Sequence, residues 1–231
     1  MFDISPTEWI AIQLSLRVAT VATLVATPLG IALAWLLARR DFWGKSVLDA
    51  VVHLPLVLPP VVTGYLLLLT FGKRGVVGAW LADHLGIVFA FRWTGAALAC
   101  GVMSFPLLVR PIRLSIEAVD RRLEQAAETL GAAPWRVFLT ITLPLALPGV
   151  LAGMVLGFAK AIGEFGATIT FVSNIPGETQ TISSAIYSLI QTPDGDTAAL
   201  RLVVVSIVIA MAALIASEWF ARRATQRLHG N

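Results

Sequence analysis

The sequence that decides the fold joins two long apolar runs and reads Asp120-Arg-Arg-Leu-Glu-Gln-Ala-Ala-Glu-Thr-Leu-Gly131-Ala-Ala-Pro134-Trp-Arg-Val-Phe-Leu-Thr-Ile-Thr-Leu-Pro144. Its first half predicts a helix, because apolar and small side chains recur at i, i+3, i+4 and i+7 and share one face. These side chains are Leu123, Ala126, Ala127 and Leu130. Gly131 suits the left-handed residue that ends a helix, and Pro134 suits the first turn of the next helix. The stretch therefore predicts two short helices joined by a turn.

The chain around this stretch is poor in charged residues. Of its 231 residues, 57% are hydrophobic and 13% are charged, whereas a soluble domain carries about 25% charged residues. Because a soluble fold needs a charged surface, this composition excludes an ordinary globular domain and indicates that lipid is the outer solvent. The net charge of +3 arises at the ends of apolar runs and not on one face, so we expect no nucleic-acid partner.

Five stretches are long and apolar enough to cross a bilayer, which takes about 20 helical residues. They are approximately 9–37, 47–71, 93–116, 143–171 and 198–220. Tryptophans, which prefer the membrane–water interface, stand near the ends of these stretches. They are Trp9, Trp43, Trp93 and Trp219. The predicted fold class is therefore all-α: residues 1–231 form one polytopic transmembrane domain of five helices.

The distribution of Lys and Arg orients these helices, because cytoplasmic loops attract positive charge. One side carries eleven of them: Arg39, Arg40, Lys45, Arg110, Arg113, Arg121, Arg122, Arg136, Arg222, Arg223 and Arg227. The other side carries four: Lys73, Arg74, Arg92 and Arg201. We therefore expect an inner-membrane protein whose N-terminus is periplasmic and whose C-terminus and loop 117–142 are cytoplasmic. A sixth crossing would reverse the C-terminus, so residues 173–178 are expected to turn and residues 182–190 to form a short helix at the outer interface.

Loop 117–142 resembles the coupling signature of ABC-importer permeases, in which Glu-Ala-Ala is followed by three residues, a glycine and a distal Leu-Pro. The alanine pair, the glycine and the Leu-Pro match in spacing, but Gln125 stands where the family has Glu. The resemblance implies that this loop couples the chain to an ATPase; periodicity alone leaves open that it packs beneath its own bundle. The residues expected to form the coupling element are Glu124, Gln125, Ala126, Ala127, Gly131, Trp135 and Pro144.

Two further stretches narrow the resemblance to oxyanion importers. Residues 54–64 (Leu-Pro-Leu-Val-Leu-Pro-Pro-Val-Val-Thr-Gly) and residues 163–182, which begin Gly-Glu-Phe-Gly-Ala-Thr-Ile, resemble the bacterial molybdate permeases. The Glu-Phe-Gly-Ala part also resembles sulfate and tungstate permeases. The resemblance implies a type I ABC-importer permease that works as a homodimer with two cytoplasmic ATPase subunits and a periplasmic molybdate-binding protein. Permeases for sulfate, thiosulfate or tungstate are alternatives, and a non-transporting membrane scaffold is the alternative from a different class.

The chain lacks the residues that would hydrolyse ATP. Gly44-Lys45-Ser46 imitates the end of a phosphate-binding loop, but Arg39 stands where that motif requires a glycine. His53, His84 and His229 are far apart in the sequence. We therefore expect no catalytic residue, no cofactor and no metal site, and we expect ATP hydrolysis by a separate subunit.

Charged side chains within the apolar stretches are costly and need a partner or a wet cavity. Lys160 and Glu164 stand four residues apart in the fourth stretch, where they are neighbours on one helical face. They are predicted either to form a structural ion pair or to serve the anion route, with Lys160 lining it and Glu164 holding Lys160 in place. Arg17, one third into the first stretch, is expected to reach back toward the outer interface.

Prolines and glycines mark where helices break or approach closely. Pro59 and Pro60 interrupt the hydrogen bonds of the second stretch, which makes it a candidate wall of the pathway. Gly149, Gly153 and Gly157 form a stripe of small residues on the fourth stretch, which predicts close packing against another helix.

Overall fold

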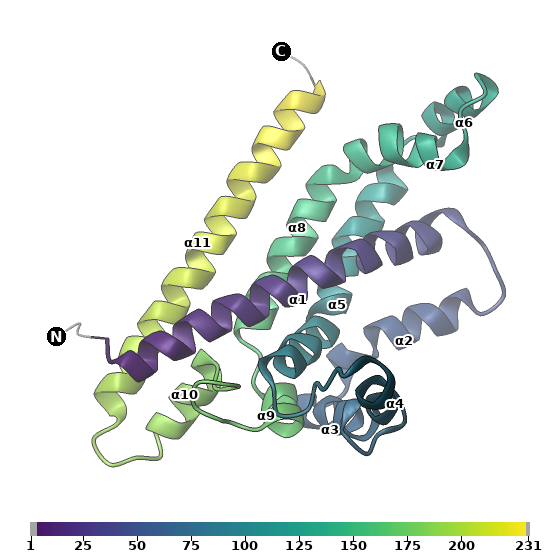
Figure 1. The fold of residues 1–231 in the computed structure, drawn as a ribbon. Helices are drawn as coiled ribbons and strands as arrows, with labels where there is room; N and C mark the ends of the chain where they lie inside the picture. Colours follow the sequence, from purple (N-terminus) through teal and green to yellow (C-terminus); the bar gives the residue numbers. More distant parts are fainter. Residues whose placement is uncertain (1–3, 230–231) are drawn as a thin grey trace.

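The computed structural model describes residues 4–229 and, within them, the side chains of residues 4–216. All regular secondary structure among the described residues is helical (Figure 1). The predicted interfacial Trp219 and the predicted cytoplasmic Arg222, Arg223 and Arg227 lie outside the described side chains.

The helices follow one another in the order of Figure 1. They are α1 (Pro6–Arg39), α2 (Lys45–Val57), α3 (Pro60–Phe71), α4 (Val76–Leu85), α5 (Trp93–Ala118), α6 (Arg121–Thr129), α7 (Pro134–Val137), the π-helical turn η1 (Phe138–Thr142), α8 (Leu143–Ile162), α9 (Gly166–Val172), α10 (Ile182–Leu189) and α11 (Asp196–His229). Four helical stretches are long and apolar enough to cross a membrane, namely α1, α5, the continuous run from α7 to α8, and α11. The bent pair α2–α3 makes a fifth if it counts as one span.

Helix α5 forms the centre of the bundle, because it packs against both α1 and α8. Its inward side chains, among them Cys100, Leu108 and Ile112, are fully buried. The glycine stripe predicted on α8 allows this packing: a Cβ atom at Gly153 would lie 2.5 Å from the Leu108 carbonyl oxygen, and one at Gly149 would lie 2.2 Å from the Ser115 Cβ atom. The prediction of close helix packing is confirmed at these two glycines.

The second and fourth predicted stretches differ from the structure, because each is broken. Helices α2 and α3 meet at an angle of 115° across Leu58 and Pro59. Proline has no backbone N–H and clashes with the preceding turn, so successive prolines end one helix and start another. The fourth stretch is predicted to be one helix as far as residue 171. In the structure α8 ends at Ile162, and a separate helix, α9, begins at Gly166. The short helix expected at 182–190 is present as α10.

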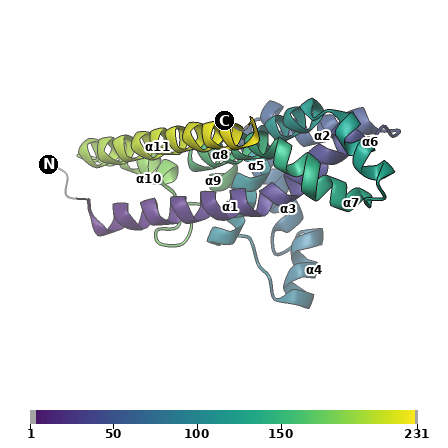
Figure 2. The same ribbon diagram turned by 90° about the horizontal axis from the view of Figure 1, so that it is seen from above.

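The two ends of the chain lie at opposite ends of the bundle. In Figure 1 the pair α6–α7 and the C-terminal end of α11 lie toward the top, while the start of α1 lies beside α10 and the start of α11. An ion pair ties the lower end together, with Arg201 Nη2 2.9 Å from Glu8 Oε1. Seen from above, α4 projects from one side of the bundle (Figure 2).

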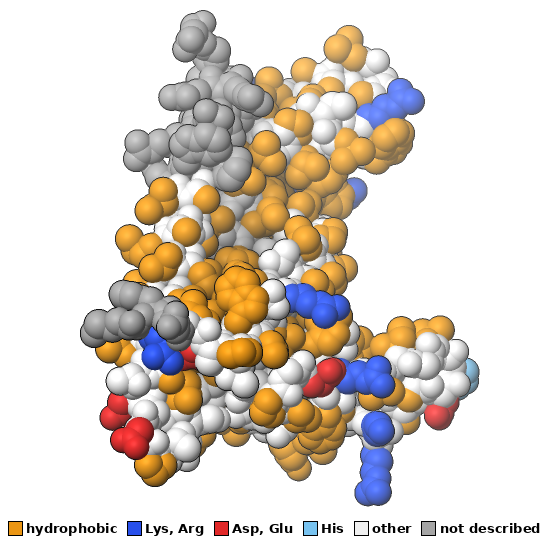
Figure 3. Space-filling view, turned by 60° about the vertical axis from the view of Figure 1, so that its left-hand side comes forward, with side chains coloured by type: hydrophobic (Ala, Val, Ile, Leu, Met, Phe, Trp, Pro, Cys, Tyr) orange, Lys and Arg blue, Asp and Glu red, His pale blue; other side chains and the backbone are white. Residues whose placement is uncertain are grey.

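The surface agrees with a membrane environment. In Figure 3 hydrophobic side chains cover much of the middle of the visible face, and most of the charged side chains in view lie in its lower half. Such an apolar belt needs lipid or other protein as its surroundings. The fold therefore is an all-helical, multi-pass membrane bundle.

Candidate functional site

The pair α6–α7 is largely exposed and carries both apolar and charged side chains on its surface. Asp120 caps α6 by accepting the Arg122 N–H at 2.9 Å, and Gly131, at φ +85°, ends the turn that follows. No residue of α6 is buried. Leu130 is 89% exposed and Trp135 is 61% exposed. The predicted helix–turn–helix is therefore present: Leu130 and Trp135 are exposed, whereas Val137 of α7 is buried against the bundle.

Glu124 ties this pair of helices to the bundle. Arg39, in the last turn of α1, donates to Glu124 Oε1 from Nε at 3.2 Å and from Nη2 at 3.0 Å. The Thr142 hydroxyl, at the end of η1, donates to the same oxygen at 2.5 Å. Arg39 Nη2 also donates to the Val119 carbonyl at 3.1 Å. One carboxylate therefore joins α6 to α1 and to the start of α8.

The other residues predicted for the coupling element face different ways. Gln125 and Ala126 are exposed and Ala127 is half-buried. Pro144 lies in the first turn of α8, away from the exposed apolar face of α6. Glu124 is half-buried and paired with Arg39, whereas the neighbouring Gln125 is exposed and borders the cavity beside that pair. The departure from the coupling signature at Gln125 therefore falls on an exposed residue.

A cavity of about 300 Å³ lies between the end of α1 and the pair α6–α7. Its lining is mixed: the charged side chains are Arg39, Arg40, Arg121, Glu124 and Glu128, and the apolar ones include Trp35, Val137 and Phe138. The junction therefore combines ionic contacts with apolar packing. Sequence reasoning treated Arg39 only as a cytoplasmic charge and missed its partner, because the two residues are 85 positions apart.

Lys160 and Glu164 form the ion pair that their spacing predicts, with Lys160 Nζ 2.7 Å from Glu164 Oε2. The Glu164 side chain is 1% exposed and the Lys160 side chain is 30% exposed. Glu164 Oε1 accepts the backbone N–H of Ala167, at the start of α9, at 3.0 Å. Glu164 therefore bridges the break between α8 and α9, while Lys160 reaches partly open space.

The two broken helices meet each other. A Cβ atom at Gly166, the first residue of α9, would lie 2.7 Å from the Pro60 Cβ atom. A Cβ atom at Gly64 on α3 would lie 2.5 Å from the Ala167 carbonyl oxygen. The break at Pro59 and Pro60 thus adjoins the break that Glu164 bridges. Sequence reasoning missed Gly64 and Gly166 as contact residues, although both glycines stand in the stretches that carry the family resemblance.

The part of the chain that the structure describes contains no group of three or more His, Cys, Asp or Glu side chains placed to hold a metal ion. Arg39 pairs with Glu124 beside α6–α7, and Lys160 pairs with Glu164 at the break between α8 and α9. The arrangement leaves an exposed, partly apolar surface at one end and a polar break within the apolar bundle.

Comparisons with known proteins assign the family. Residues 26–226 match the family described as "Binding-protein-dependent transport system inner membrane component". The chain is 62% identical over 220 residues to the "Molybdenum transport system permease protein ModB" of Escherichia coli (strain K12), across 95% of this chain and 96% of that protein. It is 58% identical to the ModB protein of Haemophilus influenzae, across 94% of this chain and 95% of that protein. The "Probable sulfate transport system permease protein cysT" of Nephroselmis olivacea is 34% identical, across 93% of this chain and 75% of that protein.

Solved structures agree in fold. A chain of a bacterial ABC transporter involved in the import of the acidic polysaccharide alginate superimposes with a TM-score of 0.75 at 21% identity, covering 96% of this chain and 81% of that one. A chain of the MetNI methionine ABC transporter gives a TM-score of 0.72 at 15% identity, covering 96% and 99%. This chain therefore belongs to the binding-protein-dependent transport system inner membrane components, and it is a non-catalytic permease subunit of an ABC importer.

Proposed function

We propose that this chain forms the membrane pathway through which molybdate, delivered by a periplasmic binding protein, enters the cell. The observation that carries this proposal is the 62% identity with a molybdenum permease over nearly the whole length of both chains. Identity with the sulfate permease is 34%, which favours molybdate over sulfate. Family membership also disfavours a scaffold without transport activity.

The exposed face of α6–α7 is the proposed docking site for a cytoplasmic ABC ATPase. Large apolar side chains, among them Leu123, Leu130 and Trp135, are exposed there beside charged ones, as expected of a surface that a partner covers. Two copies of the permease around a central pathway would present two such faces to two ATPase subunits. Gln125, which is exposed, is the proposed polar contact to the ATPase, and Glu124 is the internal tie.

ATP-driven closure of the ATPases would move α6–α7, and the Glu124 contacts would carry the movement into α1 and α8. This is a shift between inward-open and outward-open populations, driven by ATPase binding that differs between the two states. The π-helical turn η1 lies directly between α7 and α8. Such turns are rare and often occur at functional sites, so η1 is the proposed point of flexure.

The proposed orientation places α6–α7 and the C-terminal end of α11 in the cytoplasm and the start of α1 in the periplasm. It counts the bent pair α2–α3 as the second of five crossings and puts α10 at the outer interface. The excess of Lys and Arg on the α6–α7 side supports it.

The proposed anion route passes the two adjoining helix breaks. Of the ion pair Lys160–Glu164, the lysine is partly exposed and the glutamate is buried. Lys160 is therefore the candidate for transient contact with an oxyanion. Pro59 and Pro60 leave carbonyl groups without helical partners, which suits the wall of a water-filled cavity. A single lysine already paired with Glu164 binds an anion weakly, and weak binding is what conduction requires.

Uptake measurements test the proposal. The permease, its ATPase and its binding protein are reconstituted in vesicles, and labelled molybdate uptake is measured against excess tungstate or sulfate. Molybdate uptake that needs ATP and resists sulfate is the expected result. Uptake of sulfate in preference to molybdate would replace the proposed substrate, and copurification of an ATPase with a chain whose 117–142 loop is scrambled would overturn the docking role.

A further inference from the structure

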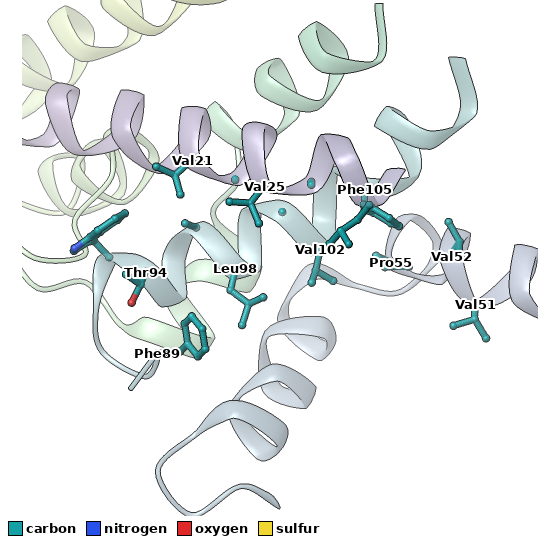
Figure 4. Close-up of a pocket in the computed structure, with 16 residues that line it drawn as sticks. Val21, Val25, Val51, Val52, Pro55, Phe89, Thr94, Leu98, Val102 and Phe105 are labelled. Atoms are coloured by element: carbon teal, nitrogen blue, oxygen red, sulfur yellow. The ribbon is translucent and has the colours of Figure 1, made fainter. Parts of the chain in front are cut away.

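An apolar groove runs along the outside of the bundle between α1, α2 and α5 (Figure 4). Its volume is about 570 Å³. Val21 and Val25 of α1 point into it toward Leu98 and Val102 of α5 (Figure 4). Pro55 of α2 lines the far end of the groove. An apolar groove on a membrane-spanning bundle has to be filled by hydrocarbon, either from lipid or from protein.

A positive charge stands at one mouth of this groove. The Arg17 guanidinium lies over the ring of Trp93, 3.7 Å from its centroid, and Trp93 lines the groove. Arg17 is exposed and precedes Val21 by four residues, so it continues the groove-lining stripe of α1 by one turn. No carboxylate among the described side chains pairs with Arg17. Its guanidinium therefore keeps N–H donors for an anionic group outside the protein.

Trp93 is the first residue of α5, so the charged mouth lies where a long apolar helix begins. Tryptophan at a helix end marks the membrane–water interface. The lining of α5 runs from Trp93 to Phe105, which at 1.5 Å per residue is about 18 Å. One leaflet of the hydrocarbon core is about 15 Å thick, half of the roughly 30 Å of the whole core. The groove thus has the depth of one leaflet, with its cation at the surface end.

The width of the groove favours a chain-like occupant. A volume of about 570 Å³ spread over about 18 Å gives a mean cross-section of roughly 30 Å². A helix about 10 Å across needs roughly 80 Å². A single hydrocarbon chain fits within this space, whereas a helix could cover only its open side.

We propose that the groove binds an acyl chain of a phospholipid whose phosphate contacts Arg17. The apolar walls would bury the chain, and the guanidinium over Trp93 would hold the anionic head group by charge-assisted hydrogen bonds. Assigning this lipid to the outer leaflet rests on the orientation given under the proposed function. The binding itself depends only on the groove and on Arg17.

Labelling with a photoreactive lipid tests the inference without measuring transport. The full chain, in complex with its ATPase, is placed in vesicles of phosphatidylethanolamine and phosphatidylglycerol that contain phosphatidylglycerol with a diazirine in its acyl chain. After irradiation, labelled peptides are located by mass spectrometry. Residues 21–29 and 97–105 are expected to carry label, alongside the exposed surface of α11 around Val208 and Met211, which serves as the internal positive control.

Two variants separate specific binding from general contact with lipid. Arg17→Gln is expected to lower groove labelling about fivefold, the effect of one basic residue on an anionic lipid. Gly101→Leu fills the groove without a clash at Cβ, because the nearest atom to that position is 3.9 Å away, and it should abolish groove labelling. Ala212→Leu, at an exposed position of α11, is the matched control and should change nothing.

The groove assignment is overturned if α11 is labelled while residues 21–29 and 97–105 are not, which is the result expected if a second copy covers the groove. Equal groove labelling in the Arg17→Gln variant would overturn the head-group contact. A chain that labels at the groove but takes up no molybdate would contradict the proposed function and leave this inference supported.

Discussion

Arg39, in the last turn of α1, and Glu124, in α6, form an ion pair in which two guanidinium nitrogens, at 3.2 and 3.0 Å, share one carboxylate oxygen. Their side chains are only 8% and 15% exposed. An ion pair so largely removed from water is costly to separate, because each charge would lose its partner in a poorly solvated place. Helix α6 therefore cannot move away from the bundle without moving α1 or breaking this contact.

Replacing Glu124 and Gln125 one at a time tests the division of roles between them. Glu124→Ala is expected to lower the free energy of unfolding by about 2 kcal/mol, the worth of a charge-assisted hydrogen bond. Gln125→Ala removes an exposed side chain and should change that free energy by less than about 0.5 kcal/mol, yet weaken copurification of the ATPase. Thermal unfolding of the purified permease and the yield of bound ATPase measure the two effects. Equal destabilisation by both substitutions would contradict the assigned roles.

The turn between α6 and α7 depends on the backbone conformation of Gly131. Its φ of +85° is left-handed, and a Cβ atom there would have open space around it. Gly131→Val should therefore cost about 1–2 kcal/mol through backbone strain, and it should uncouple ATP hydrolysis from uptake while the chain still inserts. Gly131→Asn, which tolerates this conformation, is the matched control and should retain coupling. Normal substrate-stimulated ATPase activity in the valine variant would refute the docking role.

Lys160 and Glu164 can be separated by a double substitution. Lys160→Met leaves the nearly buried Glu164 without its cation and should destabilise the chain by about 3 kcal/mol. The double variant Lys160→Met/Glu164→Gln removes both charges and should recover that stability. If Lys160 serves the anion route, the double variant will fold but take up molybdate roughly tenfold more slowly, a barrier change of ~1.4 kcal/mol. Unchanged uptake by the double variant would leave only a structural ion pair.

The contact between the two broken helices depends on glycines. Gly64→Ala would place a Cβ atom 2.5 Å from a backbone oxygen of α9, so α3 has to shift. We expect a loss of about 1–3 kcal/mol in unfolding free energy and reduced uptake. Gly163→Ala is the control, because the nearest atom to its Cβ position is 3.9 Å away. A melting temperature for Gly64→Ala equal to that of Gly163→Ala would show that the two helices do not need this close approach.

The sequence predicts α1 and α5 to within a few residues of their observed ends, because each is a continuous apolar run that ends in charged residues. It also predicts the α6–turn–α7 motif, since Gly131 and Pro134 restrict the local backbone. These features depend on neighbours in the chain. Local patterns are enough to predict them.

The sequence predicts a disturbance at Pro59 and Pro60, but not the angle of that break, the second break, or the contacts that stabilise them. Gly163, Glu164 and Gly166 interrupt the run between Ile162 and Phe171, but hydropathy does not tell whether the helix stops there or continues to Phe171. A proline within an apolar run predicts a disturbance, but the 115° bend between α2 and α3 depends on how α3 packs against α9. The Arg39–Glu124 pair joins residues 85 positions apart, and no periodicity reports such a contact.

The side of the membrane on which α6–α7 lies is the most direct test of the whole account. Cys100 is the single cysteine of the chain and is fully buried, so a cysteine introduced by Leu130→Cys, at an 89% exposed position, can be labelled alone. A membrane-impermeant maleimide should leave this variant unlabelled in intact spheroplasts, label it in inside-out vesicles, and label it less when the ATPase is bound. Labelling in intact spheroplasts would place the coupling helices in the periplasm and contradict the account.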